Sequence, residues 1–217
     1  MTGLLIKDFK LLRIQKTFFL LIVFISVAQL AFSDDPTFVV GYMSFVMTLF
    51  TLSSISYDEF DNGNAFLFSL PITRRGYVRE KYVFGIILGG GSWALSSIAV
   101  AISQLVKSNA LTIDLFVAVF VILPLIIIVL AIMLPFQLKF GGEKGRIAII
   151  GTVGIIFILC FLIAKIAQAS NIDFIAFLNN LPTLGIGTLL FIVFILSTLL
   201  LLLSYKISVA IMNKKEF

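Results

Sequence analysis

The sequence predicts an all-α integral membrane protein: six transmembrane helices, an N-terminal amphipathic helix, and a short cytoplasmic helix between spans 2 and 3. Of its 217 residues, 60% are apolar and 12% charged, and its mean hydropathy is +1.16. A soluble domain carries about 25% charged residues, so this composition excludes an ordinary globular fold. Six apolar stretches lie between the charged residues, each close to the roughly 20 residues that a membrane-spanning helix needs.

Residues 1–16 are expected to form a cytoplasmic interfacial helix. Leu5, Phe9 and Leu12 recur at helical spacing, and the basic residues lie largely elsewhere around the helix. A signal peptide is the competing interpretation, with 26–28 (Ser-Val-Ala) as its cleavage site. The long leading segment, rich in Leu, Ile and Phe, favours a retained anchor.

The apolar stretches give the spans and the end of the chain in order. The predicted spans cover about residues 17–33, 38–57, 82–106, 113–137, 147–168 and 184–205, followed by a basic cytoplasmic tail at 206–217. Asn179, Asn180 and Pro182 interrupt the last apolar stretch, so we expect 170–183 to be an interfacial turn or a re-entrant piece.

The distribution of Lys and Arg predicts that both termini are cytoplasmic. With the N-terminus inside, 14 of the 16 basic residues lie on the cytoplasmic side, and only Lys107 and Lys165 lie outside. The net charge of +5 therefore reflects the lipid bilayer as a partner, and we expect no nucleic acid.

Several classes of chemistry lack the residues they need. The chain has no histidine, and its one cysteine, Cys160, lies in an apolar run. The P-loop pattern GxxxxGK[ST] is absent, and no carboxylate falls in the middle of a span. We therefore expect no catalytic residue, no metal site, no cofactor on this chain and no ion-coupled transport.

The loop between spans 2 and 3 is the longest polar segment. It begins with acidic residues, continues with a short apolar stretch and reaches Pro71, which ends any helix there. Thr73 is a predicted N-cap for a helix that begins at Arg74. Two interpretations stay open from residue types alone: a short helix that a partner protein grips, or a solvated loop with positive anchors.

The other candidate segments carry weaker signals. A second cytoplasmic loop is expected at 135–146, as a tight glycine turn that contacts a partner or lipid headgroups through Lys139, Glu143, Lys144 and Arg146. Gln29 and Gln104 are the polar candidates to face a conduit. The GxxxG pair Gly85 and Gly89 is expected to serve helix packing, with dimerisation as the alternative.

The chain resembles a small six-helix permease of the type-2 ABC exporter family. The loop pattern E/D-x-x-x-G-x-x-x-x-x-x-L-P-x-[ST]-R is met by Glu59, Gly63, Leu70, Pro71, Thr73 and Arg74. The basic N-terminal helix resembles the elbow helix of that family. The stretch 139–146 (K-F-G-G-E-K-G-R) is similar to a loop of bacterial peptide and antibiotic exporters of the phenol-soluble modulin type.

The resemblance implies a permease subunit in the bacterial plasma membrane, without an ATP site of its own. Two copies of a cytoplasmic ABC ATPase would carry ATP and Mg²⁺, a second permease chain, identical or paralogous, would complete the transporter, and a peptide-like substrate would be exported. The ATPase-coupling residues implied are Asp58, Glu59, Asp61, Gly63, Phe66, Leu67, Phe68, Leu70, Pro71 and Arg74. Phe66, Leu67 and Phe68 would be apolar anchors of this coupling helix, with Asp58, Glu59 and Asp61 as charges at its rim.

Other classes of protein stay open beside the exporter subunit. The runner-up is a stand-alone bacteriocin-immunity or sensor protein that binds its ligand without ATP-driven transport. A scaffold component of an energy-coupling-factor importer is a third hypothesis. An intramembrane enzyme is the least favoured, because the residues present give no catalytic pair.

Overall fold

The computed structural model describes residues 2–32, 36–60, 63–107, 112–169 and 185–215; between 143 and 169 it describes the side chains of Phe161 and Lys165 alone. Nearly all of these residues are helical, and none of the described residues lies in a strand. The helices are α1 (Thr2–Ile14), α2 (Lys16–Phe32), α3 (Thr37–Glu59), α4 (Gly63–Ser69), α5 (Arg74–Val106), α6 (Ile113–Ala169) and α8 (Ile186–Lys214).

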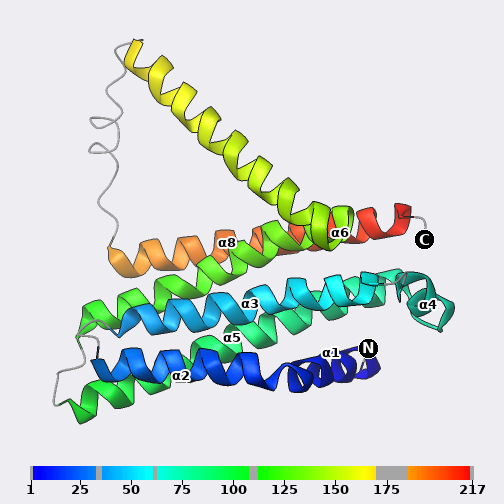
Figure 1. The fold of residues 1–217 in the computed structure, drawn as a ribbon. Coiled ribbons are helices and arrows are strands. Elements are labelled where there is room, and N and C mark those ends of the chain that lie inside the picture. Colours follow the sequence, from blue (N-terminus) through cyan, green and yellow to red (C-terminus); the bar gives the residue numbers. More distant parts are fainter. Residues whose placement is uncertain (1, 33–35, 61–62, 108–111, 170–184, 216–217) are drawn as a thin grey trace.

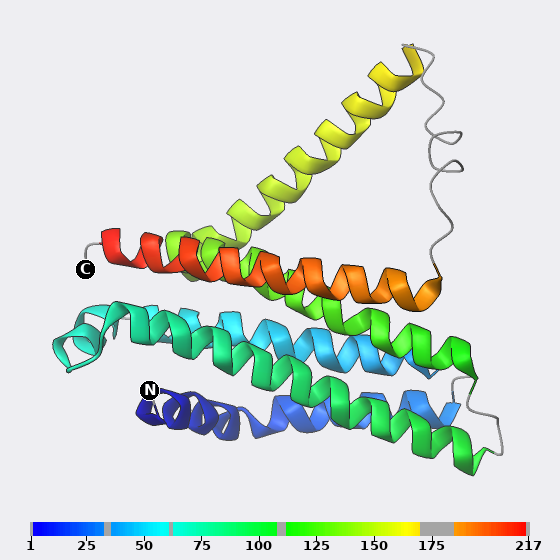
Figure 2. The same ribbon diagram turned by 180° about the vertical axis from the view of Figure 1, so that it is seen from behind.

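The long helices run side by side as a bundle (Figures 1 and 2). Helix α3 packs against α5 and α6, and α8 packs against the same two helices. The beginning of α1, the end of α8 and the short helix α4 all lie at one end of the bundle (Figure 1). The second half of α6, drawn in yellow, leaves the bundle at an angle (Figures 1 and 2).

Four described helices are long and apolar enough to cross a membrane: α3, α5, the part of α6 from Ile113 to Gly142, and α8. Helices α1 and α2 pass the same test together, bent by 69° at their junction, which gives up to five spans. The span predicted at 147–168 falls in the second half of α6, so the count of six stays a prediction. The proposed re-entrant piece at 170–183 lies outside the described residues.

The GxxxG face of α5 packs inside the bundle. A Cβ atom at Gly85 would lie 2.7 Å from the Leu130 side chain, and one at Gly89 would lie 2.6 Å from Thr48 Oγ1. These glycines therefore allow α5 to approach α3 and α6 closely, which is the packing role expected from the sequence.

Helix α6 narrows the turn expected at 135–146. The backbone is helical through Pro135, kinks at Gly141, where φ is 78° and ψ is −178°, and is helical again beyond it, so α6 consists of two helices joined at this glycine. Leu134 and Leu138 are buried in the core on either side of Pro135. Because their burial favours a helix that extends through Pro135, the turn falls at the glycine, which adopts a positive φ without a Cβ clash.

Candidate functional site

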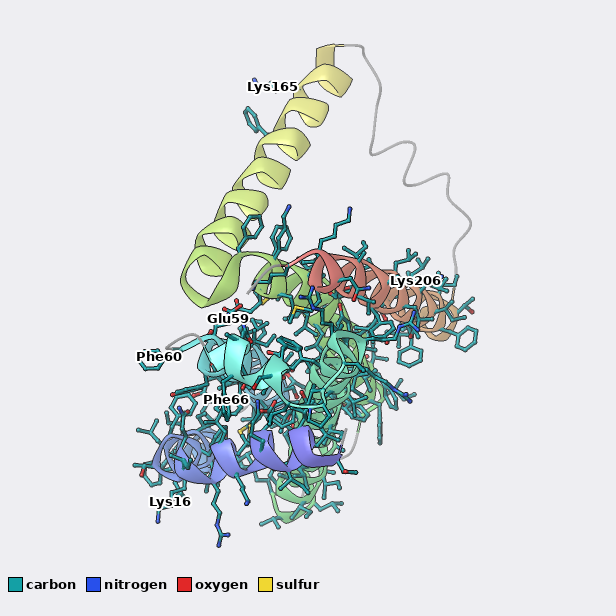
Figure 3. The ribbon with its side chains drawn as sticks, turned by 90° about the vertical axis from the view of Figure 1, so that its right-hand side faces the viewer. Lys16, Glu59, Phe60, Phe66, Lys165 and Lys206 are labelled. Atoms are coloured by element: carbon teal, nitrogen blue, oxygen red, sulfur yellow. The ribbon has the colours of Figure 1, made fainter. Side chains whose placement is uncertain are left out.

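The candidate site is the end of the bundle where α3, α4 and α5 follow one another. Figure 3 looks onto this end and labels Glu59, Phe60 and Phe66 there. Gly63 begins α4, and a Cβ atom at that position would lie 2.7 Å from the Asp58 carbonyl oxygen. Because a Cβ atom would clash with this carbonyl oxygen, the position after the acidic segment favours glycine.

Helix α4 turns one side toward the bundle and the other outward. Leu67 is buried, and the ring of Phe68 packs edge-on against Tyr77 of α5, with centroids 5.6 Å apart. Phe66, by contrast, is 72% exposed, and Leu70 is also exposed. The three expected apolar anchors therefore divide: Leu67 and Phe68 hold α4 in place, and Phe66 is free to meet a partner.

The segment after α4 is fixed by a cap. Thr73 Oγ1 accepts a hydrogen bond of 3.1 Å from the backbone N–H of Gly76, as an N-cap threonine does. Arg74 donates from one guanidinium nitrogen to the carbonyl oxygens of Met212 and Asn213, at 3.0 and 2.8 Å. Arg74 therefore satisfies carbonyls at the C-terminal end of α8 and ties the start of α5 to it.

A hollow of about 420 Å³ opens beside α4. It lies between α1 and the segment around Pro71, and Leu4, Lys7, Leu67 and Leu70 contribute to its lining. The site thus combines an exposed phenylalanine with a neighbouring depression that has one lysine in its wall.

The structure places Asp58 and Glu59 in contacts within the chain. The Asp58 side chain is 8% exposed and pairs with Lys7 and with Lys81, the latter at 2.8 Å. Glu59 accepts from Lys215 Nζ at 2.8 Å and from the backbone N–H of Gly142 at 2.9 Å. The expected role as rim charges fits neither carboxylate in this arrangement. Asp61 lies outside the described residues.

Five charged residues form a cluster beneath this end: Lys7 and Asp8 of α1, Asp58 of α3, and Glu80 and Lys81 of α5. Lys81 is fully buried and lies 2.5 Å from Asp8 Oδ2 and 3.0 Å from Ser54 Oγ. Tyr77 donates to Asp58 at 3.1 Å. Two lysines therefore face three carboxylates, and the cluster joins α1 to α3 and α5.

Glu80 and Asp8 are the unusual members of this charged cluster. Both are 0% exposed, and neither Glu80 carboxylate oxygen has a hydrogen-bond partner. The closest cation to Glu80 is Lys81, at 3.7 Å. An isolated carboxylate is costly to bury, so Lys81 is the group that makes this burial tolerable.

Sequence reasoning missed this cluster. From the sequence, Lys7 and Lys81 are two of the 14 basic residues on the predicted cytoplasmic side, and Asp8 has no predicted role. One signal was present: Asp8 is the single acidic residue in a basic leader and falls one helical turn after Leu4, which is also buried. Its burial makes the inward face of α1 less apolar than the spacing of Leu5, Phe9 and Leu12 suggested.

Of the remaining predicted residues, Lys139 lies at this end, because it follows Leu138, whose carbonyl oxygen accepts from Lys215. Lys139 contributes to hollows beside α8, and the side chains of Glu143, Lys144 and Arg146 are not described. Gln104 is buried, and Gln29 has a buried amide oxygen without a hydrogen-bond partner. No hydrogen bond between the two glutamines is found among the described residues.

The described side chains form no candidate metal site. No group of three or more His, Cys, Asp or Glu residues in the described part of the chain could hold a metal ion. The three clustered carboxylates are held by lysines instead. The arrangement can connect helices and present an apolar surface.

The apolar helices define a multi-pass helical membrane protein. The family model described as ABC-2 family transporter protein matches residues 3–213, nearly the whole chain. The chain therefore belongs to the ABC-2 family of transporter membrane proteins. No curated protein and no solved structure matches it significantly.

Proposed function

We propose that the chain is the permease subunit of an ATP-driven ABC exporter in the bacterial plasma membrane. Two copies of a cytoplasmic ABC ATPase would bind ATP and Mg²⁺ and supply the energy. A second permease chain, the same or a paralogue, would complete the translocation path. The cargo would be an amphipathic or hydrophobic peptide, toxin or peptide antibiotic.

The observation that carries this proposal is the exposed side of α4. Phe66 of α4 is 72% exposed, and Phe60, which precedes α4, is 73% exposed. Leu67 and Leu70, close to Phe66 in the chain, line the hollow of about 420 Å³. Exposed aromatic residues beside a depression are typical of protein-binding hot spots. Helix α4 also contacts the bundle through Leu67 and Phe68, so a displacement of α4 by a partner would reach α3 and α5.

The energy argument points to a separate ATPase. The sequence contains no P-loop, and no carboxylate lies at the middle of a predicted span to carry an ion gradient. Uphill transport needs a partner that binds two conformations of the permease with different affinities and so shifts the balance between them. A nucleotide-driven ATPase docked on α4 meets this requirement.

The cargo is inferred from the character of the spans. Large apolar side chains are exposed along α8, including Leu199 and Leu203. Polar side chains within the described spans are mostly Ser and Thr that bond to backbone carbonyls of their own helices. Apolar helix surfaces with few free polar groups favour an apolar cargo that enters from the lipid bilayer over a water-soluble cargo.

The test is a pull-down of the tagged chain from its native membranes in mild detergent, with mass spectrometry of the companions. We expect an ATPase with a P-loop at near-equal stoichiometry. The variant Phe66→Ala should weaken its binding roughly thirtyfold, because truncating an aromatic hot spot costs about 2 kcal/mol. Phe66→Asp should abolish co-purification.

Phe32→Ala is the matched control. Phe32 is 90% exposed at the end of α2, and Figure 1 places that end opposite to α4. Its truncation should leave ATPase binding unchanged. If Phe66→Asp retains both ATPase binding and transport, α4 is not the coupling element. A chain that purifies alone, with activity in cells that lack the ATPase, would favour the stand-alone immunity or sensor protein.

A further inference from the structure

A groove of about 1030 Å³ runs between α5 and α8, and no residue of the charged cluster or of α4 lines it. Its lining changes in character along its length. At one end it is formed by Arg75 and Arg79 of α5 and by Lys206 of α8. Figure 3 labels Lys206. Further along it is formed by apolar side chains, among them Ile86, Leu199 and Leu202.

The three cations at this end are exposed, and among the described residues none of them forms an ion pair with a carboxylate. The acidic residues nearby are already engaged: Asp8, Asp58 and Glu80 with Lys81, and Glu59 with Lys215. The groove therefore has an unneutralised positive mouth that an anion from outside the chain would complement.

The dimensions fit a lipid. Arg79 and Ile86 are seven residues apart on α5, and Lys206 and Leu199 are seven residues apart on α8, so each wall extends about 10 Å beyond its cation. One leaflet of a bilayer has a hydrocarbon depth of about 15 Å. Arg74, beside the mouth, binds the last carbonyls of α8, so the mouth lies at the helix ends, where headgroups are found.

We propose that this groove binds an anionic phospholipid of the adjacent leaflet. The phosphate and its headgroup would lie between Arg75, Arg79 and Lys206, and an acyl chain would lie along Ile86, Leu199 and Leu202. Basic pockets between transmembrane helices bind anionic headgroups by this combination of charge and apolar contact. Arg supplies paired donors in the geometry that phosphate oxygens accept.

A second copy of the chain is the less suitable occupant. A two-fold interface centred on the groove would bring the same patch from each copy together. The three cations of one copy would then face those of the other without carboxylates between them. An anionic lipid neutralises these charges instead.

The test is native mass spectrometry of the full-length chain in detergent with added dioleoylphosphatidylglycerol or dioleoylphosphatidylcholine. We expect phosphatidylglycerol to bind at least about tenfold more tightly than phosphatidylcholine. The variant Arg75→Gln/Arg79→Gln/Lys206→Gln should lose this preference. Leu202→Trp, which narrows the apolar part, should weaken the binding of both lipids.

The matched control is Lys10→Gln/Arg13→Gln/Lys16→Gln, which removes the same charge from exposed positions on α1 and α2. It should retain the preference for phosphatidylglycerol, and the unfolding temperature of each variant checks that its fold is kept. Equal binding of the two lipids, or an equal loss in the control, would overturn the proposal.

Two further outcomes would assign the groove to another occupant. If soluble glycerol 3-phosphate displaces the lipid at equal concentration, the mouth is a site for free phosphate compounds. If Leu202→Cys, in a Cys160→Ala background, forms a disulfide between two chains in native membranes, a second copy covers the groove. Either result would overturn the lipid assignment.

Discussion

Lys81 has the most consequential environment of any single residue described. It is fully buried, and Asp8, Asp58 and Glu80 all lie within 3.7 Å of its ammonium group. A buried ion pair adds little net stability relative to apolar residues, but loss of one partner leaves the others as buried, uncompensated charges. The cluster should therefore tolerate the loss of Lys81 poorly.

Lys81→Met is accordingly expected to destabilise the chain by about 3–5 kcal/mol, since three carboxylates would lose their shared cation. The measurement is the thermal unfolding of the purified chain in detergent. Glu80→Gln added to Lys81→Met should recover part of the loss, because Lys81 is the cation that pairs with Glu80 among the described residues, whereas Lys7 still pairs with Asp8 and Asp58.

Lys16→Met provides the comparison, because Lys16 is exposed at the start of α2. It should change the unfolding temperature little. A Lys81→Met variant as stable as Lys16→Met would show that the buried lysine does not hold the carboxylates together.

Among the elements, α5 is the helix on which the described bundle is built. It contacts α3, α6 and α8 through closely packed glycines and through side-chain hydrogen bonds. Glycines allow the approach to α3 and α6. Toward α8, Tyr82 bonds with Ser204 and Ser208 at 2.6 and 2.8 Å, and toward α6 the Trp93 indole donates to the Val119 carbonyl at 2.9 Å.

The GxxxG face of α5 gives a stability prediction, with a glycine elsewhere on the same helix as its control. Gly89→Leu should destabilise the bundle by about 1–3 kcal/mol, because its side chain would meet Thr48 and Ile126 where a Cβ already comes within 2.7 Å. Gly91→Leu should be nearly neutral, because nothing lies within 4 Å of that position.

Thermal unfolding and the yield of monodisperse protein measure both variants. The opposite order, with Gly91→Leu the more damaging, would indicate that the open face of α5 is a contact between chains and that the dimerisation alternative for these glycines applies.

At the scale of the whole molecule, the bundle has two unlike ends. The beginning of α1, the end of α8 and α4 lie together at one end (Figure 1). Glu59 joins three distant segments there, because it binds both Gly142 of α6 and Lys215 after α8. This end is also where the sequence concentrates its Lys and Arg, which favours a cytoplasmic position.

Orientation is testable by single cysteines in a Cys160→Ala background. In intact cells a membrane-impermeable maleimide should label Lys107→Cys and leave Lys10→Cys and Lys214→Cys unlabelled, because the positive-inside rule places both termini in the cytoplasm. Permeabilised cells should label all three. Labelling of Lys10→Cys in intact cells would reverse the predicted topology.

Local signals predicted much of the fold. Runs of apolar residues predicted the positions of α3, α5, the first part of α6 and α8, and Thr73 marked the start of α5. Helix boundaries that depend on packing against distant segments were harder to predict from the sequence. The helix through Pro135 depends on burial of Leu134 and Leu138 against other helices, and composition alone suggested a loop there.

The sequence by itself determined the class of protein, because solvation in a bilayer depends on the length and apolarity of each segment and on where its charges fall. The structure decided the partners of the charges. Asp58 and Glu59 looked like free acids in a loop, and they are held by Lys81 and Lys215, which lie 23 and 156 residues away along the chain. Residue types do not reveal such pairs, because a pairing energy depends on the distance between two charges and on their shared burial, and both arise only when the helices pack.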